Sequence, residues 1–134
     1  MDQEKGMALL DELRKMLGSF GYKTTEEDDI VLALLLSHRE QSIKNECNID
    51  MVPTGLDHIL INQVCGRFLL ARYTSGQLEL PSLDLGGALS SISEGDVSVS
   101  FDSDASDDAK MQMLIRALCD TGKDELLCYR KLRW

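Results

Sequence analysis

Hydrophobic residues recur at steps of three and four along most of the chain, which is the spacing of one face of an α-helix. This spacing predicts four helices, over residues 3–20, 26–46, 53–73 and 107–129. The apolar stripe of the first helix consists of Leu9, Leu10, Leu13, Met16, Leu17 and Phe20. That of the third consists of Leu56, Ile59, Leu60, Val64, Phe68 and Ala71, and that of the last of Ala109, Met111, Met113, Leu114, Ala117 and Leu118.

The second helix has a different pattern in each half. Its first half contains the run IVLALLL, which is apolar nearly all round and therefore predicts burial on several sides. Its second half, SHREQSIKNEC, is largely polar. We therefore expect this helix to be central at its N-terminal end and exposed at its C-terminal end.

Signals for helix ends lie where the hydrophobic pattern stops. Gly18 and Gly21 flank the end of the first helix and supply a C-terminal stop. Thr24 and Glu27 have the spacing of a capping box, in which side chains and backbone N–H groups at the start of a helix satisfy one another. The four acids Glu26–Asp29 lie at the positive end of the helix dipole and point in different directions around one turn. They therefore favour a cap over a metal site.

Three further positions shape the later helices. Pro53 opens the third helix, where its missing N–H would have no partner anyway. Gly66 lies inside that helix and allows another backbone to approach closely. Thr121–Gly122 is expected to kink or divide the last helix.

One stretch, ISEGDVSVSF at 92–101, ends in strict alternation and predicts a half-buried β-strand. A single strand leaves its backbone N–H and C=O groups without partners. Either Leu78–Leu80 folds back to form a hairpin, or another chain supplies the edge. The predicted fold is thus mainly α: a small bundle of about four helices, with a loop and strand arm over about 75–105. The candidate subunit interface consists of Leu78, Leu80, Ile92, Val97, Val99 and Phe101.

A second candidate contact lies at 129–134, where aromatic and aliphatic residues alternate with positive charges. Trp and Arg are the residues most enriched at the centres of protein interfaces. We therefore expect docking onto another protein through Tyr129, Arg130, Lys131, Leu132, Arg133 and Trp134.

Composition narrows the class of protein. A length of 134 residues suits a single domain, and a net charge of −9 disfavours tight binding to nucleic acid phosphates. The four cysteines form no CxxC pair, and the start of the chain does not have the pattern of a signal peptide. No apolar run is long enough to cross a membrane. A soluble intracellular protein with free thiols is expected.

The sequence contains no recognisable catalytic constellation. Only His38 and His58 are available as bases at neutral pH, and neither lies beside a nucleophile motif. The acidic segment after the strand lacks the Gly and the Glu that a calcium loop requires at its sixth and twelfth positions. We expect no enzyme activity, no cofactor and no metal.

The order of these segments resembles a known family. It runs from LLDELRKMLG through EEDDIVLALLLSHREQSIKNECN and VPTGLDHILINQVCGRFLLARY to ISEGDVSVSF and LLCYRKLRW. This order, and SEGDVSVSF and YRKLRW above all, is similar to the head–tail connector, or adaptor, proteins of long-tailed double-stranded-DNA bacteriophages.

The resemblance implies a structural role in the virion. Such proteins are small helical bundles that form a ring, commonly of twelve copies, beneath the portal protein. The ring extends the DNA channel, lets the duplex pass without specific binding, and receives the stopper or tail-completion protein. Residues 129–134 would then dock on the portal. The alternative is a small acidic helical interaction module or regulator of bacterial origin, and a third hypothesis is an enzyme without a recognisable motif.

Overall fold

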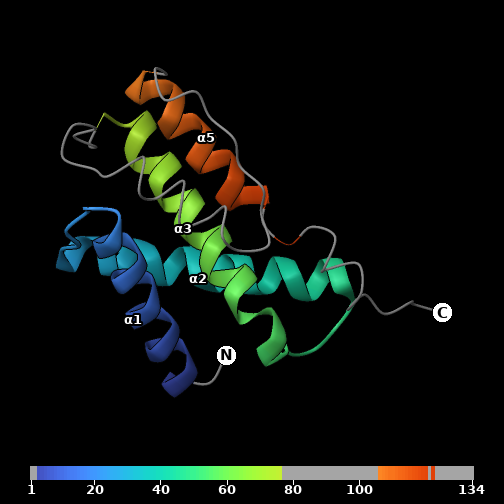
Figure 1. The fold of residues 1–134 in the computed structure, drawn as a ribbon. Helices are drawn as coiled ribbons and strands as arrows, with labels where there is room; N and C mark the ends of the chain where they lie inside the picture. The colour runs from blue at the N-terminus through green and yellow to red at the C-terminus, as the bar shows by residue number, and fades with distance from the viewer. Residues whose placement is uncertain (1–2, 77–105, 121, 123–134) are drawn as a thin grey trace.

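The computed structural model describes residues 3–76, 106–120 and 122. Four α-helices account for most of them: α1 (Gln3–Ser19), α2 (Glu26–Cys47), α3 (Asp57–Thr74) and α5 (Asp107–Asp120) (Figure 1). A short 3₁₀ turn, η1 (Thr54–Leu56), precedes α3. No strand occurs within these ranges, and the mainly α prediction is confirmed for them. The predicted strand at 92–101 lies outside the described residues.

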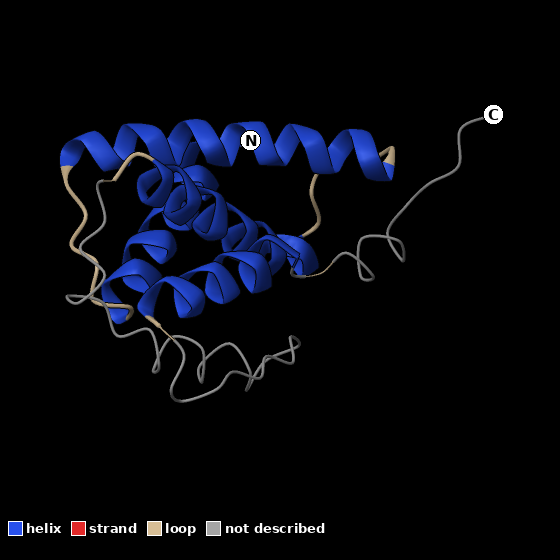
Figure 2. Ribbon diagram, turned by 90° about the horizontal axis from the view of Figure 1, so that it is seen from above, coloured by secondary structure: helices blue, strands red, loops and turns tan. Residues whose placement is uncertain are grey.

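Helix α3 is the central element, because it contacts α1, α2 and α5. Figure 2 shows α2 as the long horizontal helix, with the other helices gathered on one side of it. A helix with neighbours on several sides needs apolar or small residues all round. This explains why α3 buries eight residues: Ile59, Leu60, Gln63, Val64, Cys65, Gly66, Phe68 and Leu69.

The core is built from one apolar stripe of each surrounding helix. The stripe predicted for α1 is confirmed: Leu9, Leu13, Leu17 and Phe20 are buried, and Leu10 and Met16 pack at its edge. From α5 the buried residues are Met111, Leu114, Ile115, Ala117 and Leu118. The core therefore consists mostly of aliphatic side chains, with Phe68 as its largest fully buried member.

The predicted stop of α1 at Gly21 is confirmed. Gly21 adopts a left-handed backbone conformation with φ of 90°, which residues with a Cβ rarely adopt. The turn brings the N–H of Tyr22 to the carbonyl of Leu17 at 2.9 Å, so the end of the helix keeps a backbone partner.

The capping box of α2 is present but displaced by one residue from the prediction. The N-cap is Thr25, whose Oγ1 accepts the N–H of Asp28 at 3.4 Å. In return, the N–H of Thr25 donates to Oδ2 of Asp28 at 3.0 Å. Two adjacent threonines precede the four acids, so either threonine could be the N-cap. Thr25 takes this place because Asp28, its partner in the box, is also held by Tyr22 and Arg72.

The predicted start of the third helix was also misplaced, since Pro53 precedes η1 and α3 begins at Asp57.

Two glycines control the packing of α5. A Cβ on Gly66 would lie 2.8 Å from Cβ of Leu118 and 2.9 Å from the backbone N of Cys119, so the predicted close approach is confirmed. The predicted last helix extended to residue 129, but α5 ends at Asp120. Gly122 has φ of 77°, which lies outside the right-handed helical region. The residues from 123 onward lie outside the described part.

The prediction for α2 is confirmed only in part. Its polar half is mostly exposed or half-buried, as expected, but it buries Glu40, Ile43 and Cys47. Its apolar half buries Leu32 and Leu36 but exposes Ile30 and Leu34. The reason is geometric: neighbours lie on one side of α2, so a single face is buried along its whole length. That face carries a buried residue at every turn: Asp28, Leu32, Leu36, Glu40, Ile43 and Cys47.

Candidate functional site

The outer face of α2 exposes two large apolar side chains. Ile30 is 72% exposed and Leu34 is 62% exposed, and they lie one turn apart on the side away from the core. Two exposed carboxylates, Glu26 and Glu27, precede them by one turn. Neighbouring large apolar side chains left in water are typical of a surface that binds another protein.

A buried carboxylate fixes the orientation of this helix. Asp28 is almost fully buried, and its Oδ1 lies 2.6 Å from Nη2 of Arg72 on α3. Its Oδ2 accepts hydrogen bonds from the hydroxyl of Tyr22 at 2.9 Å and from the N–H of Thr25. A buried charge is tolerated when it is paired and its lone pairs are satisfied. Because Asp28 must face α3, Ile30 and Leu34 must face outward.

Aromatic contacts reinforce the same junction. The rings of Tyr22 and Phe68 meet edge to face, with centroids 5.5 Å apart, and the guanidinium of Arg72 lies 5.3 Å from the Phe68 centroid. Burial, followed by the hydrogen bond to the Asp28 carboxylate, raises the pKa of Tyr22 to about 12. The phenol is therefore neutral and acts as a donor at neutral pH.

A second ion pair joins α1 to α2. Nε and Nη2 of Arg14 each lie 2.9 Å from an oxygen of Asp29, which is the bidentate geometry that guanidinium favours. The hydrogen bond from Arg14 holds the pKa of Asp29 below its usual value, and the same bond raises the pKa of Arg14. This pair fixes α1 against the N-terminal part of α2.

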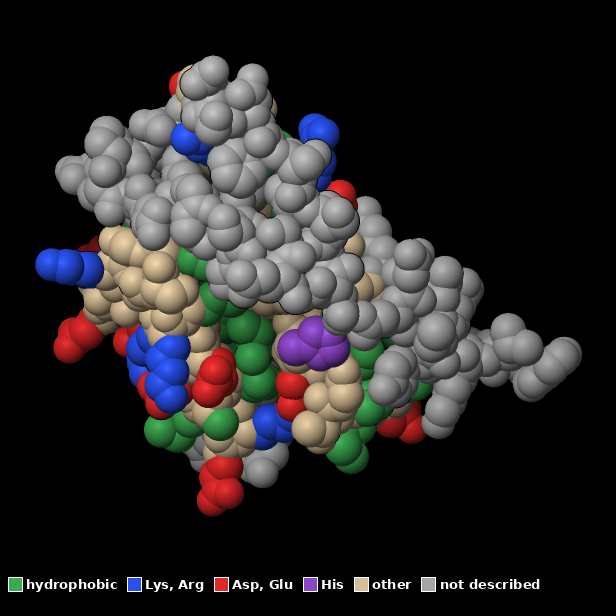
Figure 3. Space-filling model, in the orientation of Figure 1, with side chains coloured by type: hydrophobic (Ala, Val, Ile, Leu, Met, Phe, Trp, Pro, Cys, Tyr) green, Lys and Arg blue, Asp and Glu red, His purple; other side chains and the backbone are tan. Residues whose placement is uncertain are grey.

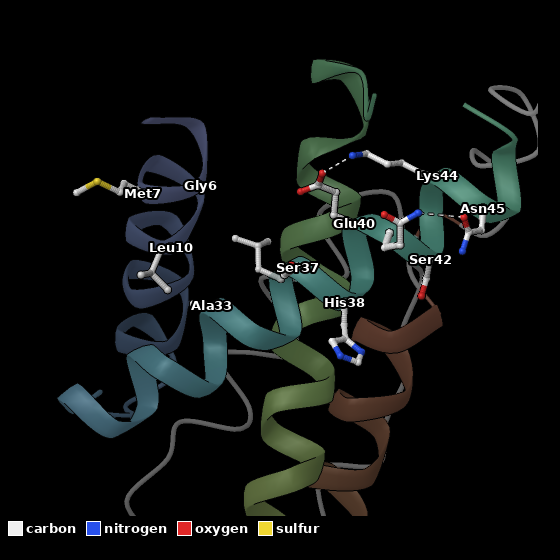
Figure 4. Close-up of a pocket in the computed structure, with 12 residues that line it drawn as sticks. Gly6, Met7, Leu10, Ala33, Ser37, His38, Glu40, Ser42, Lys44 and Asn45 are labelled. Carbon is white, nitrogen blue, oxygen red and sulfur yellow. Dashed lines mark hydrogen bonds and ion pairs between the residues drawn. The ribbon is translucent and has the colours of Figure 1, made fainter. Parts of the chain in front are cut away.

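Away from that pair, a groove of about 770 Å³ opens between the two helices (Figure 4). The wall from α1 is formed by Gly6, Met7 and Leu10, and that from α2 by residues between Ala33 and Asn45. Small residues on both walls, such as Gly6 on α1 and Ala33 and Ser37 on α2, leave this space between the helices open. Met7 is 69% exposed, so the rim of the groove adds a further apolar side chain to the surface.

The far part of the groove is polar and internally paired. Nζ of Lys44 lies 2.7 Å from Oε1 of Glu40, and Gln41 donates to Asn45 at 3.1 Å. Glu40 and Lys44 also line a smaller hollow of about 310 Å³, at whose edge Lys5 and Asp57 form a 3.1 Å ion pair. These charged side chains are paired with one another. A partner entering the groove would therefore meet apolar surface and paired charges more than uncompensated charge.

The chemistry available among the described side chains is limited. His38 is exposed, as expected, and in Figure 4 it points away from α1. His58 is also exposed. Within residues 3–76, 106–120 and 122, no group of three or more His, Cys, Asp or Glu side chains is arranged to hold a metal ion. Burial raises the pKa of the Cys65 thiol, which disfavours the reactive thiolate.

None of the interface residues predicted from sequence falls within the described ranges. Leu78, Leu80, Ile92, Val97, Val99 and Phe101 lie in 77–105, and Tyr129–Trp134 lie in 123–134. The exposed apolar side chains Ile30 and Leu34 on α2, and Met7 on α1, were missed. For α2 the missed signal was the continuation of the Leu32 and Leu36 pattern into Ile43 and Cys47, which fixes the buried face.

The remaining surface is charged and mixed. In Figure 3, acidic and basic side chains alternate around the lower part of the visible face, with hydrophobic side chains between them. None of the described helices combines the length and the apolar character that a membrane crossing demands.

Comparisons with protein-family models, with curated proteins and with solved structures found no match to the chain.

Proposed function

We propose that this protein is a head–tail connector of a long-tailed bacteriophage, which acts by assembling rather than by catalysis. In this proposal it forms a homo-oligomeric ring beneath the portal protein, and the ring extends the DNA channel towards the stopper or tail-completion protein. The order of the sequence segments supports this proposal, and the helical bundle is compatible with it.

The observation that carries the proposal is the outer face of α2. Ile30 and Leu34 are large, apolar and mostly exposed, while the polar half of the same helix buries Ile43 and Cys47. Neighbouring exposed apolar side chains of this kind suit a contact with another subunit, and a ring subunit covers such a face on assembly.

The charge of the chain also suits a channel. A net charge of −9 repels the phosphates of double-stranded DNA, so the duplex would slide through without being gripped. The basic segment Tyr129–Trp134 is proposed to dock on the portal, and the arm with Leu78, Val97 and Phe101 to contact neighbouring copies. No membrane and no cofactor take part in this proposal.

Deletion of Tyr129–Trp134 tests the portal contact. The truncated chain should remain folded, as measured by circular dichroism, and monomeric, as measured by gel filtration. It should no longer co-sediment with portal protein. Normal co-sedimentation of the truncated chain would contradict the docking role of this segment.

The position of the gene is an independent check. A location between capsid and tail genes supports the connector, whereas an operon with a transcription factor supports a regulator.

A further inference from the structure

Two exposed faces of the described bundle carry opposite chemistry. The first, the acidic–apolar face of α2, consists of Glu26, Glu27, Ile30 and Leu34. The second, the basic–apolar face of α3, consists of Arg67, Leu70, Ala71 and Thr74. The members of the second face recur at steps of three and four, so they form one continuous surface on the C-terminal half of α3. Leu70, at its centre, is 43% exposed.

The charges on these faces are available for contacts. Glu26 and Glu27 form no ion pair with any described residue, and neither does Arg67. The acids of α2 that do form pairs, such as Asp28 and Asp29, point toward the bundle instead. Each face therefore combines uncompensated charge of one sign with exposed apolar surface.

The two faces point to different sides of the molecule. The buried side of α2 packs on α3, so the acidic–apolar face is directed away from α3. On α3, Arg72 reaches toward Asp28 of α2, and Leu70 lies two residues before it. Side chains two residues apart on a helix point in nearly opposite directions, so the basic–apolar face is directed away from α2.

We infer that the acidic–apolar face of one copy binds the basic–apolar face of the next copy. Carboxylates would meet a guanidinium at the rim, and Ile30 and Leu34 would pack against Leu70. Because two different faces meet, the contact repeats head to tail, and it gives a ring when the rotation from one copy to the next closes on itself. This inference rests on the proposed function, since it assigns the contact between subunits of the ring.

Cross-linking between two variants tests the contact directly. Leu34→Cys and Leu70→Cys chains, each with a different tag, are mixed with portal protein, and ring formation is followed by electron microscopy. A short bis-maleimide should then cross-link Leu34→Cys chains to Leu70→Cys chains several-fold more efficiently than it cross-links wild-type chains to one another. The wild-type chains measure the background from the native thiols. The control pair is Lys15→Cys with Leu70→Cys, because Lys15 is exposed on α1 outside both faces.

Each outcome decides a different question. Rings in which Leu34→Cys chains join mainly to one another, or in which no specific product forms, would overturn this inference and leave the proposed function intact. Failure of every variant and of the wild-type chain to form a ring on portal would overturn the proposed function as well.

Reversal of charge gives an independent readout. The Arg67→Glu chain should assemble less than wild type, and the Glu26→Lys/Glu27→Lys chain likewise. When all three substitutions are placed in one chain, assembly should recover toward the wild-type level, because the two faces are again complementary. Losses that simply accumulate in the triple variant would argue against this pairing of faces.

Discussion

Arg72 and Asp28 are 44 residues apart in sequence, yet Nη2 of the first lies 2.6 Å from Oδ1 of the second. This single contact connects the end of α3 to the start of α2. It holds the start of α2 with the same side against α3 that Leu32, Leu36, Ile43 and Cys47 bury further along. The opposite side, which carries the candidate interface, is left for a partner.

Asp28→Asn should destabilise the protein by about 3 kcal/mol, because it leaves the charge of Arg72 largely buried without its partner. Chemical denaturation at pH 7 measures the free energy of unfolding. The matched control is Glu12→Gln, which removes an exposed carboxylate 3.9 Å from Lys15 and should cost less than about 0.5 kcal/mol. Equal losses for the two variants would show that the buried pair contributes no more than a surface one.

Tyr22 should make the stability depend on pH in the alkaline range. Its pKa is raised to about 12 in the folded protein, from an ordinary value of 10.0. The folded state thus favours the neutral phenol, so this contribution is complete below about pH 10 and is lost as the pH rises toward 12. Tyr22→Phe lacks the titrating group. The stability difference between wild type and Tyr22→Phe should shrink from pH 9 to pH 12, and a constant difference would contradict the raised pKa of Tyr22.

Gly66→Ala should destabilise the protein although Ala is the better helix former. Alanine gains about 1 kcal/mol in a helix interior, but its Cβ would collide with the Leu118 side chain and the Cys119 backbone. Overpacking of this kind costs about 1–3 kcal/mol. Thermal unfolding should show a lower midpoint than wild type.

Gly18→Ala is the matched control for this glycine. It lies in α1, and a Cβ there would meet nothing within 4 Å. This variant should be as stable as wild type or more stable, by up to about 1 kcal/mol. A stabilising effect of both substitutions would mean that α3 and α5 do not approach as closely as described.

Substitutions on opposite sides of α2 test its orientation. Leu34→Gln should change the free energy of unfolding by less than about 0.5 kcal/mol, because the side chain is already mostly in water. Leu32→Ala should cost about 2–5 kcal/mol, because Leu32 is fully buried. Urea denaturation of both variants distinguishes the two sides, and a large loss for Leu34→Gln would place it in the core instead.

The presence of the helices was predictable from sequence because apolar residues recur at helical spacing in each of them. The buried face could be identified only where these residues form one regular stripe. For α1 the spacing of Leu9, Leu13 and Leu17 was sufficient to identify the buried face. For α2 it was not, because IVLALLL has apolar residues on every side and local composition cannot say which of them is covered. The covered side becomes clear only when Leu32 and Leu36 are followed beyond this run into Ile43 and Cys47. In the folded protein, Arg72 of α3 holds Asp28 on the same side.

The candidate site on α2 was not predicted from the sequence, for the same reason. The sequence pointed to segments at 78–101 and 129–134, where unusual composition is visible without tertiary information. Ile30 and Leu34 look like ordinary core residues until the buried face of α2 is known. Their significance comes from exposure, which is a property of the packed bundle.

The connector proposal is tested most directly by electron microscopy of the protein mixed with a portal protein encoded in the same genome. The account predicts an additional ring, coaxial with the portal and stacked on one of its ends, that is absent from images of portal alone. Portal particles that remain unchanged at a large excess of the folded chain would contradict it.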